Sequence, residues 1–141
     1  MELFVYSRSA FEAVRPHDVP HVVISITSST ADIARVRDNP FRRDILRLSF
    51  PDADAASALF AERDLFSREH ASSIWTFIRR HKDIERVIVH CDAGISRSAA
   101  VAAALARVLN GSDAEFFGGR YRPNMRTYRM LLDMGMEGIV T

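Results

Sequence analysis

Cysteine is almost absent from this chain of 141 residues, which contains only Cys91. A single cysteine cannot form a disulfide within the chain, and metal sites built from cysteine need several such ligands. We therefore expect Cys91 to be a free thiol or thiolate.

Long apolar runs and a charge imbalance are also missing. No apolar stretch is long enough to cross a membrane, and the N-terminus MELFVYSRSAFEA lacks the basic start and long apolar core of a secretion leader. The formal net charge is only +1, despite eighteen arginines and one lysine, which argues against a dedicated nucleic-acid binder. We expect a soluble, cytoplasmic protein that binds neither nucleic acid nor membrane, and the sequence carries no signal for an oligomeric state.

The length is that of one globular domain, and no linker or repeat divides the chain. Short β-branched runs between turns predict strands, and amphipathic or alanine-rich segments predict helices. The predicted strands are Leu3–Tyr6, His21–Ile26, Ile45–Phe50 and Arg86–Cys91. The predicted helices are Ser9–Arg15, Thr30–Arg37, Ser67–His81, Arg97–Leu109 and Met125–Met134. This alternation predicts a single α/β domain over residues 1–141, with a mostly parallel central sheet of four to five strands flanked by helices.

The stretch VIVHCDAGISRSAAVAAAL places Cys91 where a predicted strand ends and an alanine-rich helix follows. Ligands of parallel sheets bind beyond the carboxyl ends of the strands, and the free N–H groups of a tight turn and a helix start attract anions. Gly94 supplies the backbone freedom for such a turn, and Arg97 can hold two oxygens of a phosphoryl group. These positive surroundings favour a thiolate, so Cys91 is a candidate nucleophile to which Ser98 could donate a hydrogen bond.

Two motifs extend this interpretation. HCDAGISRSAA, residues 90–100, resembles the signature loop of the cysteine-dependent protein tyrosine phosphatases, and its AGISRS wording is closest to the small, atypical dual-specificity phosphatases of bacterial type. RPNMRTYRMLLD, residues 122–133, is similar to the last helix of that family, which starts with Pro-Asn. The resemblance spans roughly residues 22–133 and implies a tyrosine phosphatase-like fold that hydrolyses phosphomonoesters.

The resemblance also implies roles for individual residues. Cys91 would be the nucleophile, Arg97 the phosphate clamp, Ser98 the helper of thiolate departure and His90 a support for the loop. The residues that would bind the substrate phosphate are Asp92, Ala93, Gly94, Ile95, Ser96 and Arg97. Asp92 is unusual here, because a carboxylate beside a thiolate opposes its ionisation unless it points outward or neutralises an arginine.

The leaving oxygen of a phosphate ester needs a proton that a thiolate cannot supply. The resemblance calls for an upstream aspartate, and the candidates are Asp52 and Asp54 in LSFPDADAAS and Asp64 in AERDLFS. Asp52 ranks first, because FPD is similar to the Trp-Pro-Asp acid loop of the larger tyrosine phosphatases, and Asp54 ranks second. Asp64 ranks third, because an aspartate before a helix commonly has a capping role. Asp52 precedes Cys91 by 39 residues, a longer gap than is typical of the small enzymes.

The loop also bears on the substrate. Phosphoinositide phosphatases of the superfamily tend to carry lysines at the variable positions of this loop, whereas the loop of this chain has none. We therefore expect a phosphorylated protein as the substrate, with phosphotyrosine ahead of phosphoserine and phosphothreonine. RDNPFRR, residues 37–43, either lines the entrance of the site or forms a solvated charged face. Two other functions stay open, namely a phosphate-binding module without turnover and a rhodanese-like sulfurtransferase.

Overall fold

The computed structural model describes the backbone of residues 1–140 and the side chains of residues 1–137. The strands are β1 (Glu2–Ser7), β2 (His21–Thr27), β3 (Arg42–Ser49) and β4 (Arg86–Cys91). The helices are α1 (Arg8–Ala13), α2 (Arg68–Arg80), α3 (Arg97–Asn110) and α4 (Met125–Val140), with short 3-10 helices at Glu62–Asp64 and Ala114–Phe117.

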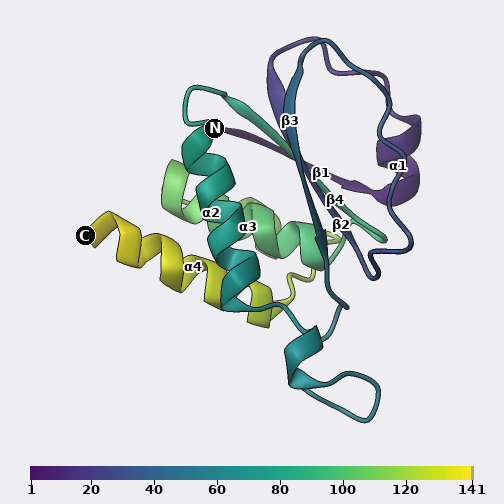
Figure 1. Cartoon of the computed structure of the whole chain (residues 1–141). Helices are drawn as coiled ribbons and strands as arrows, with labels where there is room; N and C mark the ends of the chain where they lie inside the picture. Colours follow the sequence, from purple (N-terminus) through teal and green to yellow (C-terminus); the bar gives the residue numbers. More distant parts are fainter. Residues whose placement is uncertain (141) are drawn as a thin grey trace.

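The four strands form one parallel sheet in the order β1-β4-β2-β3. Helices α2, α3 and α4 cover one face of this sheet, and the short α1 lies against the other (Figure 1). The structure thus confirms the predicted α/β class with a parallel central sheet. Because all strands run the same way, their carboxyl ends meet at one edge, where ligands of such sheets bind.

Strand β4 alternates its side chains between the two faces. Val87, Val89 and Cys91 belong to the core under α2, α3 and α4, whereas Ile88 and His90 face the side of α1. This two-residue period is the ordinary geometry of a strand. It places the sulfur of Cys91 on the same face as α3, the helix that follows it in the chain.

Helix α3 is almost completely enclosed, with every residue from Arg97 to Ala106 buried. Its alanines are small enough for the helix to lie close to β1 and β4 on one side and to α4 on the other. The helix ends at Gly111, whose φ of 87° is the left-handed conformation that glycine adopts without strain.

Helix α2 starts where the sequence predicts. The Ser67 side chain accepts a hydrogen bond from the backbone N–H of His70, and the His70 ring accepts one from the backbone N–H of Ser67. This reciprocal pair satisfies two otherwise free helix-end donors. Trp75 lies in the core, and its indole N–H donates to the carbonyl of Leu131 in α4 at 2.8 Å.

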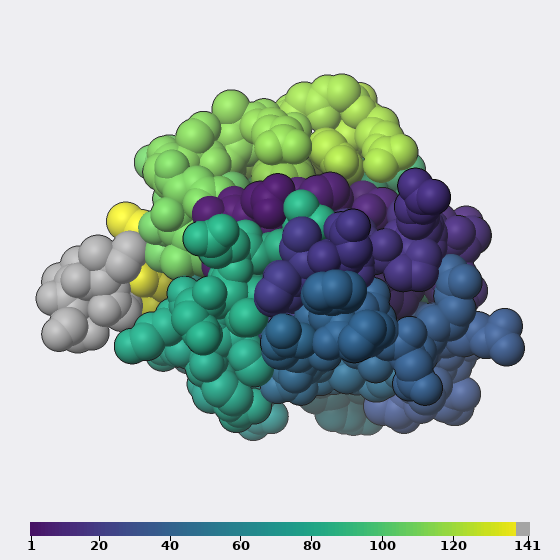
Figure 2. Space-filling view, turned by 90° about the horizontal axis from the view of Figure 1, so that it is seen from above, coloured from purple at the N-terminus to yellow at the C-terminus, as the bar shows by residue number. Residues whose placement is uncertain are grey.

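The predicted helix Thr30–Arg37 is wrong, because this segment is irregular between β2 and β3. Its polar groups bond to other elements instead of to one another. Arg8 donates to the Asp32 carboxylate and the Ile33 carbonyl, and Arg47 donates to the Ala34 carbonyl. The segment therefore lies beside the N-terminal part of the chain, as Figure 2 shows for the blue and purple atoms.

Within the part of the chain that the structure describes, no helix combines the length and the apolarity needed to span a membrane.

Candidate active site

The turn from β4 to α3 runs from Cys91 to Ser96 and depends on Gly94. Gly94 has a φ of 70°, in the left-handed region that side chains disfavour. A Cβ at this position would also lie 2.4 Å from the backbone nitrogen of Ser7 and 2.7 Å from the backbone carbonyl carbon of Tyr6. The turn is therefore pressed against the end of β1, and only glycine fits there.

The sulfur of Cys91 is buried at the base of this turn, with 1% of the residue exposed. Ser98 Oγ lies 3.0 Å from Sγ, and the backbone N–H of Gly94 donates to Sγ at 3.3 Å. Ser98 is itself fully buried in the first turn of α3. These groups can stabilise negative charge on the sulfur when it attacks or leaves.

Arg97 turns back from the start of α3 toward the ends of three strands, and only 5% of it is exposed. Its Nη1 donates to the Phe50 carbonyl at 2.9 Å and to Ser28 Oγ at 3.0 Å, and its Nη2 donates to Asp92 Oδ2 at 3.1 Å. The Nε–H is buried and has no partner among the described residues. A buried donor without a partner is costly, which suits a place that an anion fills.

Asp52 is brought to this turn although it lies 39 residues upstream. Its Oδ1 accepts hydrogen bonds from Ser96 Oγ at 2.8 Å and from Asn124 Nδ2 at 3.0 Å. Asn124 Oδ1 in turn accepts from the backbone N–H of Thr127 and so caps α4. Both donors contact one carboxylate oxygen, which leaves Oδ2 available to a substrate.

The other two candidate acids are not held in this way. Asp54 lies two residues further along the same exposed segment, and Asp64 ends the 3-10 helix before α2. Neither carboxylate has a hydrogen bond or ion pair among the described side chains. Of the three candidate acids, only Asp52 has a carboxylate that is hydrogen-bonded to the turn after Cys91.

His90 lies on the opposite face of β4 from the Cys91 sulfur. Its Nε2 is 2.6 Å from Ser25 Oγ in β2, and its ring stacks on Phe11 of α1 at a centroid distance of 4.4 Å. Burial lowers the pKa of His90 to about 4, so the ring is neutral near pH 7. His90 connects β4 to β2 and α1 and does not reach the sulfur side.

Two residues of the site were missed by the sequence analysis. Ser28 contacts Arg97 from the end of β2, and Asn124 contacts Asp52 from the start of α4. Ser28 lies two residues after the predicted strand His21–Ile26, and this position was an available signal because the carboxyl ends of the strands meet at one edge of the sheet. Asn124 stood inside the quoted RPNMRTYRMLLD motif, but nothing in the sequence paired it with an aspartate 72 residues away.

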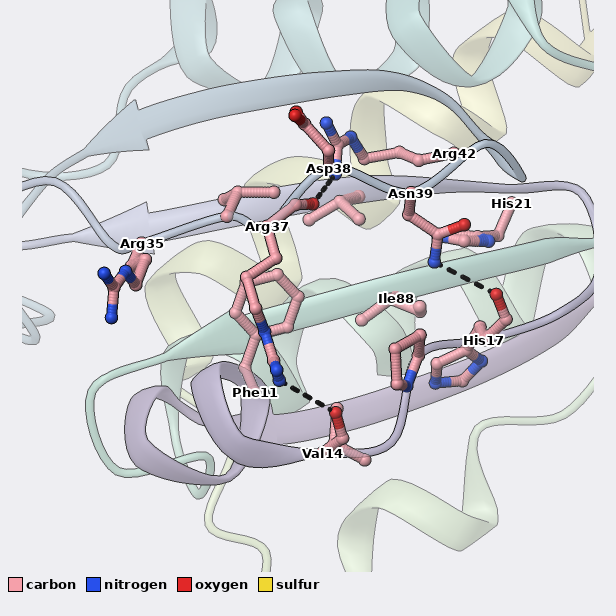
Figure 3. A pocket seen from close by; sticks show the side chains of 13 residues that line it. Phe11, Val14, His17, His21, Arg35, Arg37, Asp38, Asn39, Arg42 and Ile88 are labelled. Atoms are coloured by element: carbon pink, nitrogen blue, oxygen red, sulfur yellow. Dashed lines mark hydrogen bonds between the residues drawn. The ribbon is translucent and has the colours of Figure 1, made fainter.

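The RDNPFRR segment does not line the entrance of this site. Arg37 donates to the carbonyls of Glu12 and Val14 at the end of α1, and Arg42 begins β3 at the opposite edge of the sheet. With Asn39, which donates to the His17 carbonyl, these residues surround a separate cavity of about 60 Å³ on the α1 side (Figure 3). The residues described by the structure contain no cluster of His, Cys, Asp and Glu suited to a metal ion.

Comparison with solved structures adds to this geometry. Human tyrosine phosphatase-like serine/threonine/tyrosine-interacting protein superposes with a TM-score of 0.66 at 21% identity, over 97% of this chain and 93% of its own. Human DUSP28 superposes with a TM-score of 0.61 at 21% identity, over 99% of this chain and 90% of its own. PTPMT1 in complex with PI(5)P superposes with a TM-score of 0.59 at 16% identity, over 99% of this chain and 93% of its own. The chain has a tyrosine phosphatase-like fold. No protein-family model and no curated protein sequence matches it.

The structural matches extend further along the chain than the resemblance in sequence. The resemblance in sequence starts near residue 22, whereas the structural matches cover 97 to 99% of the chain. Strand β1 and helix α1 are therefore part of the shared fold. Strand β1 joins the fold through backbone hydrogen bonds to β4, and such bonds place few demands on which residues form the strand.

Replacing Gly94 by alanine should destabilise the protein by about 2 to 4 kcal/mol, because the new Cβ meets both a left-handed φ and the backbone of β1. Gly118→Ala is the matched control, since a Cβ there meets nothing within 4 Å. Chemical denaturation of the two variants measures the difference. Equal unfolding free energies would contradict the close approach of this turn to β1.

The lowered pKa of His90 predicts acid sensitivity. The folded ring titrates at about 4 and an unfolded one near 6.5, so its contribution is complete above pH 6.5 and is lost as the pH falls toward 4. The loss should approach about 3 kcal/mol, since one pKa unit corresponds to about 1.4 kcal/mol. Unfolding free energies of wild type and His90→Gln, measured from pH 4 to pH 7, test this. A variant with the wild-type slope would show that other groups cause the sensitivity.

Proposed function

We propose that this protein hydrolyses phosphomonoesters through a phosphocysteine intermediate, without a metal ion or cofactor. The observation that carries the proposal is the meeting of three groups at one turn. These are a buried, hydrogen-bonded sulfur at Cys91, a buried guanidinium with a free N–H at Arg97, and a carboxylate at Asp52 held from two sides.

In the first step, the Cys91 thiolate attacks the phosphorus atom and the bond between phosphorus and the ester oxygen breaks. The electron pair leaves with that oxygen, which takes a proton from Asp52. Arg97 and the backbone N–H groups of residues 92–97 hold the three remaining phosphoryl oxygens as charge develops on them. The products are an alcohol or phenol and a phosphocysteine.

In the second step, a water molecule attacks the phosphocysteine while the Asp52 carboxylate takes one of its protons. The bond between phosphorus and sulfur breaks, and the sulfur leaves as a thiolate that accepts a hydrogen bond from Ser98. Inorganic phosphate is released and Asp52 is again protonated for the next cycle. His90 supports the strand that carries the nucleophile and takes no part in proton transfer.

We further propose phosphorylated protein side chains as the substrate, with phosphotyrosine first and phosphoserine or phosphothreonine second, in the cytoplasm. Support comes from the loop, whose variable positions Asp92, Ala93, Ile95 and Ser96 include no cation for a polyphosphate or an inositol phosphate. The structural relatives do not decide between a protein and a phosphoinositide substrate, because one is named tyrosine phosphatase-like and another was solved in complex with PI(5)P. The serine in contact with the thiol and the acid held at the same turn favour phosphoryl transfer over a sulfurtransferase reaction.

Cys91→Ser should reduce hydrolysis of an aryl phosphate by at least about 10⁴-fold, because the serine hydroxyl is not ionised near pH 7. Inorganic phosphate should still bind, since Arg97 and the backbone donors remain. Steady-state kinetics and calorimetric titration measure the two properties. Phosphate binding by a wild-type protein that turns over no aryl phosphate would support a binding module instead of an enzyme.

Asp52→Asn should slow aryl phosphates with poor leaving groups by about 10² to 10⁴-fold, because those oxygens need a proton, and should slow substrates with good leaving groups much less. A series of substituted phenyl phosphates gives this dependence on the leaving group. Asp54→Asn is the matched control. If the leaving-group dependence appeared in Asp54→Asn and not in Asp52→Asn, the acid would be Asp54.

A further inference from the structure

Asp92, the residue after the nucleophile, pairs with Arg97 while 47% of its side chain stays exposed to solvent. Its Oδ2 accepts from Arg97 Nη2 at 3.1 Å and from Ser28 Oγ at 3.4 Å. Ser28 Oγ also accepts from Arg97 Nη1 at 3.0 Å. The three side chains thus form a closed ring of hydrogen bonds between the end of β2, the turn and the start of α3.

The ring leaves part of the guanidinium free. An arginine side chain has five N–H hydrogens. Two on Nη1 bond to Phe50 and Ser28, and one on Nη2 bonds to Asp92, so the Nε–H and one hydrogen on Nη2 remain. Asp92 and a bound phosphate therefore use different hydrogens of the same group, and the carboxylate can hold the arginine without occupying the phosphate position.

The ring also removes the surplus positive charge of the turn, because Arg97 is its only cation and Asp92 carries the opposite charge. Two further arginines, Arg8 and Arg122, have backbone hydrogen bonds to the turn, and their guanidinium groups bond to residues outside it. Arg8 pairs with Asp32 and Glu12, and Arg122 donates to the carbonyls of Gly119 and Tyr121. A phosphate here is held by directed N–H donors rather than by excess charge.

We propose that Asp92 is a positioning and specificity-determining residue of this site, which holds Arg97 for the phosphate and restricts the site to phosphomonoesters with no second anionic group nearby. The inference rests on the proposed phosphatase function. A second phosphate or carboxylate on the substrate meets the exposed carboxylate of Asp92, whereas a neutral or cationic group is accepted.

Three phenyl phosphates that carry a carboxylate, a carboxamide or an aminomethyl group test the restriction. In Asp92→Asn, the kcat/KM for the carboxylate probe relative to the carboxamide probe should rise about tenfold over wild type, the effect of one charge pair near a protein surface. The kcat/KM for the aminomethyl probe relative to the carboxamide probe should fall below its wild-type value in the same variant. Comparing each ratio between the variant and wild type cancels the differences in leaving group among the probes. The change in kcat/KM should come from KM, because asparagine keeps an acceptor oxygen for Arg97.

Asp83→Asn is the matched control, since it removes one exposed negative charge from the segment before β4, at the opposite edge of the sheet. It should leave all three ratios as in wild type. The restriction is overturned if Asp92→Asn keeps the wild-type ratios, or if Asp83→Asn changes them equally.

Inorganic phosphate, titrated by calorimetry, tests the positioning role without turnover. Asp92→Ala should weaken phosphate binding about tenfold, because the guanidinium loses its partner, whereas Asp92→Asn should bind phosphate at least as tightly as wild type. Ser28→Ala, which opens the ring but keeps the direct ion pair, should fall between wild type and Asp92→Ala. Both variants remove the charge of Asp92, and only asparagine keeps an acceptor for Arg97. Equal phosphate affinity in Asp92→Ala and Asp92→Asn would therefore overturn the positioning role.

The two proposals can fail separately. A wild-type protein that binds phosphate and hydrolyses no phenyl phosphate would refute the enzymatic function, while the titrations of Asp92→Ala and Asp92→Asn would still decide whether Asp92 holds Arg97. A wild-type protein that hydrolyses the probes without discrimination by charge would keep the function and refute the restriction.

Discussion

The buried guanidinium of Arg97 is the interaction on which the site depends. A positive charge that is almost fully enclosed is tolerated only with hydrogen-bond partners, and here each partner follows a different strand. Ser28 follows β2, Phe50 follows β3 and Asp92 follows β4. Parallel pairing in register is what brings these three strand ends within reach of one side chain, so the sheet defines the position of the arginine. In the proposed function, the arginine in turn defines the position of the phosphate.

The strands and the cysteine loop could be predicted from the sequence because their signals are local. Each strand is a short β-branched run, and the loop is one continuous motif with a glycine and an arginine at fixed offsets. The helix predicted at Thr30–Arg37 was wrong because that prediction used local composition alone, and the local composition suits a helix. Its polar groups are instead satisfied by Arg8, Glu12 and Arg47 from distant parts of the chain, and such tertiary hydrogen bonds override local preference.

The contacts that complete the site have no local signal. Asn124 and Ser28 are polar residues among many, and only the fold brings them to Asp52 and Arg97. The role of β1 was hidden in a different way. It limits position 94 to glycine through its backbone atoms, so almost any sequence that forms a strand would meet this requirement. For the same reason, the resemblance in sequence begins after β1 although the shared fold includes it.

The distribution of charge around Cys91 explains how a nearly neutral protein can offer an anion site. His90, the residue before Cys91, is neutral and faces away, and Asp92, the residue after Cys91, neutralises Arg97. What remains for an anion is a set of N–H groups fixed in direction by a glycine turn, a helix start and a hydrogen-bonded guanidinium. Directed donors act over a few ångströms, whereas excess charge attracts any anion at long range. In the proposed function, the site therefore distinguishes a phosphoryl group by its shape, and the carboxylate of Asp92 at its edge adds a penalty for further negative charge.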